Sequence, residues 1–170
     1  MKIFANGLQK SGTNALAKAL VLLGFDCEVV HVPFAEPWPE PVVCIVRHPR
    51  NVLCSYVRAR QRLPGVAALT RALGEFYGVP FRGACEQYLP WLASGVPVVR
   101  YEALVASPQA MVDLAARVGV GYVSGAFERL PGGTLTWTGA PSDWTRTWTP
   151  ALDAAWTEAG MDAIQAAMGY

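Results

Sequence analysis

A glycine-bearing loop near the N-terminus has the residue types of an anion site. Gly7 to Asn14 separates a short apolar strand at 2–5 from a run of residues with helical spacing. In such an arrangement, successive backbone N–H groups and the N-terminus of the helix can surround a phosphate. The loop departs from the nucleoside triphosphate-binding pattern, because Thr13 follows Gly12 in place of a lysine and the lysine, Lys10, lies inside the loop. The alternative is that the two glycines only make a tight turn.

A second candidate anion ligand follows a predicted buried strand. The continuous apolar run 42–46 is typical of a parallel strand covered on both faces, and it ends in Arg47. Enzymes that transfer phosphoryl groups usually have an acidic residue there that helps to hold magnesium, so an arginine predicts anion binding without a metal. Ser55 follows eight residues later, on a predicted helix, where it can join Arg47 on one phosphate. The later arginines of this segment are predicted to form a solvated basic helix face: Arg58, Arg60 and Arg62.

The composition excludes several classes of protein. The 170-residue chain is 52% hydrophobic and 16% charged, which excludes a disordered chain and a coiled coil. Its formal net charge of +1 argues against a protein that holds nucleic acid by bulk electrostatics. The four cysteines form no CxxC pair, so we expect reduced, mostly buried thiols. No apolar stretch has the length of a signal peptide or a membrane span, and we therefore expect a cytoplasmic protein.

The order of the predicted elements indicates a single α/β domain over residues 1–170. Strands are predicted at 2–5, 27–32, 42–46 and 97–101. Helices are predicted at 15–23, at 51–62, in two pieces within 64–94, after the N-cap pair Ser107-Pro108, and after Thr149-Pro150. We expect a three-layer fold of the P-loop type, with a mostly parallel sheet of about four or five strands flanked by helices.

Two segments resemble the cofactor-binding motifs of sulfotransferases. Gln9 to Leu16 is similar to the P-K-S-G-T-T-W-L loop, which in that family binds the 5′-phosphosulfate of 3′-phosphoadenosine 5′-phosphosulfate (PAPS). Arg47 to Tyr56 is similar to the R-x-P-R-D-V-x-x-S-Y segment, whose arginine and serine bind the 3′-phosphate. Both motifs stand in the family's order. The resemblance implies that the 5′-phosphosulfate is bound by Gln9, Lys10, Ser11, Gly12, Thr13 and Asn14, and the 3′-phosphate by Arg47 and Ser55.

Two shorter segments extend the resemblance. Val99 to Leu104 resembles the family's R-Y-E-D-L segment, which implies that Tyr101 lies near the adenine. His31-Val32-Pro33 is similar to the family's H-L-P segment, which implies that His31 is the general base that takes the proton of the acceptor. Glu36 and Glu40 are competing carboxylates on the proline-rich loop that follows. His48 is expected to be a local hydrogen-bonding group.

The C-terminal part of the chain resembles the segment that closes over the cofactor, with departures. Gly139 to Thr149 is similar to the family's G-x-x-G-D-W-K-x-x-F-T stretch. Ser142 replaces its second glycine and Thr145 replaces its lysine. Trp137-Thr138 stands where the family has a basic pair. The expected substitutes for the missing cations are Arg146 and Arg129.

The resemblance implies a sulfotransferase that uses PAPS. Such an enzyme moves a sulfuryl group by in-line transfer, without a metal, to a hydroxyl or amine of a small-molecule or carbohydrate acceptor. Lys10, as a mobile point charge, can follow the charge that develops on the leaving group. Two alternatives stay open. One is a P-loop kinase of a small molecule, which would need magnesium. The other is a catalytically weak protein that binds only PAPS or its product, 3′-phosphoadenosine 5′-phosphate (PAP).

Overall fold

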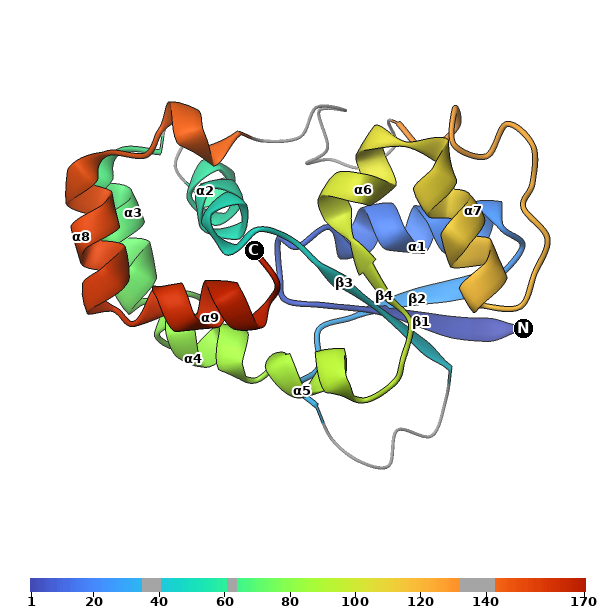
Figure 1. Cartoon of the computed structure of the whole chain (residues 1–170), viewed down its shortest axis with the longest axis horizontal. Helices are drawn as coiled ribbons and strands as arrows, with labels where there is room; N and C mark the ends of the chain where they lie inside the picture. Colours follow the sequence, from blue (N-terminus) through green and yellow to red (C-terminus); the bar gives the residue numbers. More distant parts are fainter. Residues whose placement is uncertain (35–40, 61–63, 132–142) are drawn as a thin grey trace.

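Four short strands form an all-parallel sheet at the centre of the molecule (Figure 1). The computed structural model describes residues 1–34, 41–60, 64–131 and 143–170. The strands are β1 (Lys2–Asn6), β2 (Asp26–Val30), β3 (Val42–Val46) and β4 (Val98–Arg100), and their order in the sheet is β2-β1-β3-β4. The predicted strands and their parallel pairing are confirmed.

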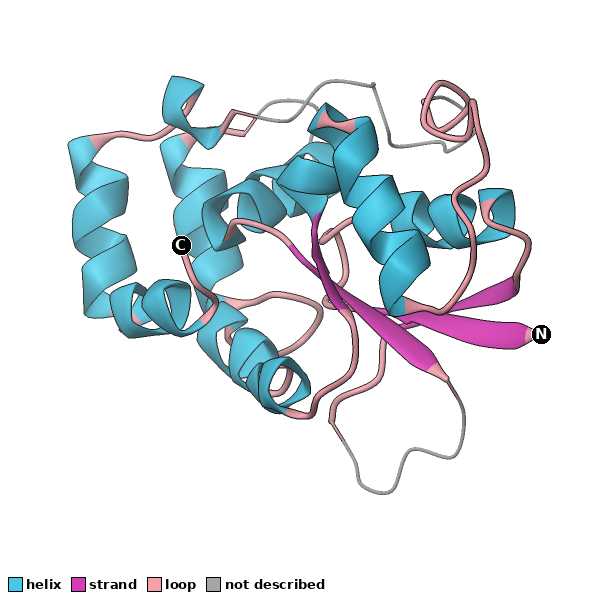
Figure 2. Cartoon of the chain, turned by 45° about the vertical axis from the view of Figure 1, so that its right-hand side comes forward, coloured by secondary structure: helices cyan, strands magenta, loops and turns pink. Residues whose placement is uncertain are grey.

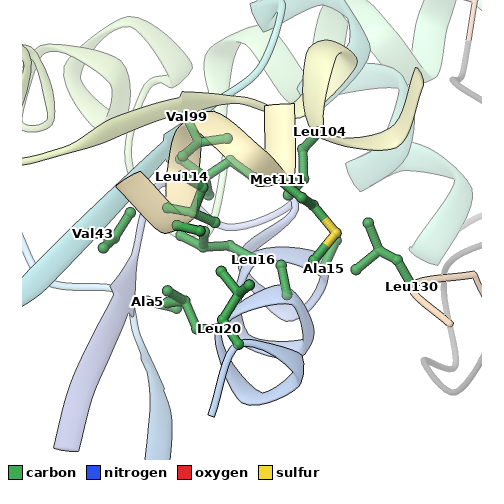
Figure 3. Packing of buried hydrophobic residues seen from close by; sticks show 14 of the residues in the cluster. Ala5, Ala15, Leu16, Leu20, Val43, Val99, Leu104, Met111, Leu114 and Leu130 are labelled. Carbon is green, nitrogen blue, oxygen red and sulfur yellow. The ribbon is translucent and has the colours of Figure 1, made fainter. Parts of the chain in front are cut away.

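Helices cover one face of this sheet because alternate strand residues are apolar. Ile3, Ala5, Val43 and Ile45 all lie in one buried cluster with residues of α1 (Thr13–Leu22), α6 (Tyr101–Ala106) and α7 (Pro108–Arg117). Figure 3 shows Leu16 and Leu20 of α1 close to Ala5. This packing fixes the direction in which α1 leaves the loop after β1.

The other face of the sheet is covered by α5 (Leu89–Ala93). Phe4, Val42 and Cys44 lie in one buried cluster with Trp91. The Trp91 indole N–H donates to the carbonyl of Val32, at 3.1 Å. Both faces are thus buried, which explains why β3 is apolar throughout. The expected three-layer α/β architecture is confirmed.

A second buried cluster lies beyond the carboxyl ends of the strands, on the left of Figure 1. It joins residues of α2 (Pro49–Arg60), α3 (Val66–Gly74), α4 (Phe81–Glu86), α8 (Pro150–Glu158) and α9 (Met161–Ala167). Figure 2 shows these helices gathered on one side of the strands. The cluster holds α2 in place where β3 ends.

Several element boundaries differ from the sequence prediction. Tyr101 begins α6 instead of ending β4, because its ring is buried against the α1 side of the core. Residues 64–94 form three helices, not two. The final helix is divided at Gly160, whose φ of 69° is left-handed and which starts α9.

Other local predictions are confirmed. The hydroxyl of Ser107 accepts from the N–H of Gln109, and that of Thr149 accepts from the N–H of Leu152, so both residues cap helices as expected. All four cysteines are free thiols, and three of them are buried.

The core between α1 and the sheet gives a direct test of this packing. Leu16 is fully buried, so Leu16→Ala leaves a cavity and should lower the free energy of unfolding by about 2–5 kcal/mol. Val21 is 54% exposed on the same helix, and Val21→Ala should change it by less than about 0.5 kcal/mol. Urea unfolding measures both. Equal losses would contradict the assignment of Leu16 to the core.

Candidate functional site

The loop between β1 and α1 has a fixed conformation. The N–H of Ser11 donates to the carbonyl of Leu8, at 2.9 Å, and the carbonyl of Gly12 accepts from Ala15 and Leu16 in the first turn of α1. Lys10 has a φ of 70° and Gly12 a φ of 107°, so the chain turns twice through the left-handed region before the helix begins. The first N–H groups of α1 lack acceptors within the helix and are available to an anion.

Both glycines of this loop are required by close packing. A Cβ built on Gly7 would stand 2.7 Å from the carbonyl oxygen of Ile45 and 2.7 Å from Ser11 Oγ. A Cβ on Gly12 would collide with the ring of Tyr101. The glycines therefore let the loop lie directly against β3 and α6, which is more than a tight turn needs.

Ser11 supplies a polar group that the described residues leave unsatisfied. Its side chain is 1% exposed, and its Oγ has no hydrogen-bond partner within the described part of the chain. A buried hydroxyl without a partner is costly. Ser11 lies in the same loop as Lys10 and next to the N-terminus of α1. An anion bound there would accept a hydrogen bond from this hydroxyl.

Arg47 is held against this loop. Its guanidinium donates to the carbonyl of Lys10, at 3.0 Å, and lies over the ring of Tyr101, 4.2 Å from the ring centre. The side chain is 6% exposed, and burial lowers the pKa of Arg47, which the negative potential of Tyr101 and Glu102 partly offsets. The structure thus brings together Lys10, Arg47 and Tyr101.

Glu102 ties the start of α2 to the end of the chain. Its carboxylate accepts from the N–H of His48, at 3.0 Å, and from the hydroxyl of Tyr170, at 2.8 Å. Burial and the nearby Glu102 raise the pKa of Tyr170, so the phenol stays protonated and donates a hydrogen bond to Glu102. His48 accepts from the N–H of Arg50 through Nδ1, and burial lowers the pKa of its imidazole. This agrees with the local hydrogen-bonding role expected of His48.

His31 reaches the same loop from the end of β2. Its Nδ1 lies 2.7 Å from the carbonyl oxygen of Gly7. A carbonyl only accepts, so Nδ1 carries a proton, and in the matching neutral tautomer Nε2 is the acceptor. The side chain is exposed. The geometry therefore leaves His31 able to accept a proton beside the loop.

Asn6 positions His31 and is a site residue that sequence reasoning missed. It is fully buried at the end of β1. Its Oδ1 accepts from the N–H groups of Gly7 and Val32, and its Nδ2 donates to the carbonyl of Val32. One amide thereby joins the start of the loop to the residue after His31. A buried polar residue at the carboxyl end of an apolar strand is the signal that could have identified it.

The remaining predicted ligands are Ser55 on α2, Arg129 and Arg146. Ser55 is half-buried on α2. Arg146 is exposed in a short 3-10 helix, Trp144–Arg146, which is joined to the start of α2 by the N–H of Trp144 donating to Asn51, at 3.0 Å. Arg129 donates to the carbonyl of Gly125. Three predicted positions lie outside the described residues, together with Trp137-Thr138: Glu36, Glu40 and Ser142.

Arg50 occupies the centre of an aromatic cluster beside α2. Its guanidinium pairs with Asp153, at 3.0 Å, and lies over the rings of Trp144, Trp148 and Trp156. Trp144 also stacks on His48, with ring centres 5.2 Å apart. These contacts assign Trp144, Trp148 and Trp156 to packing around α2.

Two cavities lie away from the loop. One of about 480 Å³ is lined by Arg100, Arg117 and Met168 beside β4. Another of about 530 Å³ is lined by Met1, Pro41 and Pro97 at the amino ends of the strands. Ligands of open parallel sheets bind outside the carboxyl ends, so neither cavity replaces the loop as the candidate site.

Two further classes of feature are missing from the part of the chain that the structure covers. Among these residues, no group of three or more His, Cys, Asp or Glu side chains could hold a metal ion. None of the helices there combines the length and apolar character that crossing a membrane requires.

Comparison with known proteins identifies the fold. No family model matches the chain, and no curated protein matches it by sequence. The solved structure of mouse sulfotransferase SULT7A1 complexed with PAP is similar to it, with a TM-score of 0.69 and 15% sequence identity over 99% of this chain and 88% of that one. At this level of identity the likeness concerns the backbone. The chain therefore has the α/β fold of a sulfotransferase.

Proposed function

We propose that this chain is a sulfotransferase that takes its sulfuryl group from PAPS. The observation that carries the proposal is that the buried Arg47, at the end of β3, binds the loop that holds Lys10 and the unsatisfied Ser11 hydroxyl. The likeness to a sulfotransferase complexed with PAP supports it. When bound, PAPS would supply the activated sulfuryl group and its adenosine bisphosphate leaving group.

The residues present fit a doubly phosphorylated ligand. Gly12 and Thr13 stand where α1 begins, so their N–H groups favour a 5′-phosphate through hydrogen bonding and the helix dipole. The Ser11 hydroxyl gains the partner that it lacks. Gln9 and Asn14 flank the same turn. Arg47 and Ser55 are proposed to hold the 3′-phosphate, and Tyr101 and Arg146 to contact the nucleotide.

Lys10 and His31 have the chemical properties that sulfuryl transfer requires. The Lys10 ammonium stabilises negative charge that builds on the leaving oxygen. His31 takes the proton of the acceptor at Nε2, while its Nδ1–H stays bound to the carbonyl of Gly7. The acceptor is proposed to be a hydroxyl or amine of a small molecule or carbohydrate.

The proposal is tested by transfer of radiolabelled sulfate. Purified protein with labelled PAPS and a panel of hydroxyl and amine acceptors should give labelled product, and the rate should be unchanged in EDTA, because Arg47 stands where a magnesium ligand would be. A small-molecule kinase would instead transfer phosphate from ATP and stop in EDTA. Tight binding of PAPS without product from any acceptor would favour a binding protein.

His31→Ala should separate catalysis from binding. Loss of the base should lower kcat about 100-fold or more and leave the PAP affinity within about twofold, since the hydrogen bond of His31 to the loop involves the Gly7 carbonyl and none of the anion-binding N–H groups. Initial-rate assays measure kcat, and calorimetry measures the affinity for PAP. Unchanged turnover would overturn the role of His31 and direct attention to Glu36 or Glu40.

Lys10→Met should lower kcat by about 100- to 1000-fold, because a cation that stabilises the leaving group is lost. Lys18→Met serves as the matched control: Lys18 lies on α1, where its ammonium donates to the carbonyl of Pro131. We expect the control to keep its activity within about twofold. Equal activity of the two variants would show that Lys10 takes no part in the transfer step.

A further inference from the structure

One face of α2, which carries Ser55 and Arg58, remains accessible to solvent. Over residues 51–57, every side chain is buried except Ser55. Arg58 is exposed and follows Ser55 by three residues, so the two share one face of the helix. Arg58 therefore adjoins the serine that the proposed function places on the 3′-phosphate.

The helix also inclines the Arg58 side chain toward the end of α2 that Arg47 precedes. Side chains on a helix lean toward its N-terminus, and Arg47 lies just before the N-terminus of α2. The charges agree with this placement. Burial lowers the pKa of Arg47 and the positive charge of Arg58 lowers it further. Burial raises the pKa of Cys54, which lies one turn before Arg58, and the Arg58 charge opposes that rise.

No described acidic side chain pairs with Arg58. The ion pairs among the described residues are Lys2–Glu28, Arg50–Asp153 and Arg82–Glu86. The guanidinium groups of Arg47 and Arg58 repel each other, and the Ser55 hydroxyl lies on the same helix face as Arg58. An anion bound between these groups would relieve the repulsion and so lower the free energy of the site.

We propose that Arg58 is a ligand of the 3′-phosphate, together with Arg47 and Ser55. This inference rests on the proposed function and deepens it. The chain has no basic pair at 137–138, and Arg129 is bound to the carbonyl of Gly125. Arg58, expected from sequence to be only part of a solvated face, supplies the second cation from α2 itself.

The test compares Arg58→Gln with Arg60→Gln by calorimetry. Arg60 is a suitable control because it is exposed on the same helix and lies over the rings of Tyr56 and Tyr77. The ligands are PAP and adenosine 5′-phosphosulfate, which lacks the 3′-phosphate. Arg58→Gln should weaken PAP binding about ten- to a hundredfold and leave adenosine 5′-phosphosulfate within about twofold. Arg60→Gln should leave both within about twofold.

Thermal unfolding gives a second readout that a structural role would not produce. Arg58→Gln removes a repulsion, so the ligand-free variant should melt no lower than the wild type, while its gain in Tm with PAP should shrink. Equal PAP affinity in Arg58→Gln and wild type, or equal weakening of both ligands, would overturn the inference and leave the proposed function standing. Failure of the wild type to bind PAP would overturn both.

Discussion

Arg47 carries its charge into the interior at the end of β3, and a buried guanidinium is tolerated only where other groups replace the water that it loses. Two segments supply those groups. The Lys10 carbonyl comes from the loop after β1, and the Tyr101 ring and the Glu102 carboxylate come from the start of α6. Arg47 therefore joins the loop after β1 to the start of α6. The geometry of the site thus follows from the way this one charge is solvated.

The hydrogen bonds of Glu102 connect the site to the helical cluster beyond the sheet. Through His48 it fixes the first residues of the segment leading into α2, and through Tyr170 it fixes the last residue of the chain. The loop is also held by close packing, because no space remains between the Gly12 backbone and the Tyr101 ring. An anion at this loop would therefore meet groups that are already in position, which reduces the cost of binding.

Much of the architecture could be predicted because it depends on local pattern. The run 42–46 is β3 without change, and the two hydroxyl caps are where the sequence indicates. The start of α6 at Tyr101 could not be predicted, since a run of two valines, an arginine and a tyrosine also fits a strand. Only the tertiary structure shows that the Tyr101 ring packs into the core. The motifs also indicated the loop and Arg47 as parts of one site. The bond from Arg47 to the Lys10 carbonyl and the bridge made by Asn6 depend on strand register, which one sequence does not reveal.

The proposed function depends on whether this site recognises two phosphates on one adenosine. Calorimetry with PAP and with ATP in metal-free buffer measures this most directly, because both ligands carry phosphate at the 5′ position and only PAP carries it at the 3′ position. The account predicts that PAP binds at least about tenfold more tightly than ATP, through charge-assisted contacts to the 3′-phosphate. Equal affinity for the two nucleotides would leave Arg47 and Ser55 without the proposed role and would contradict the account.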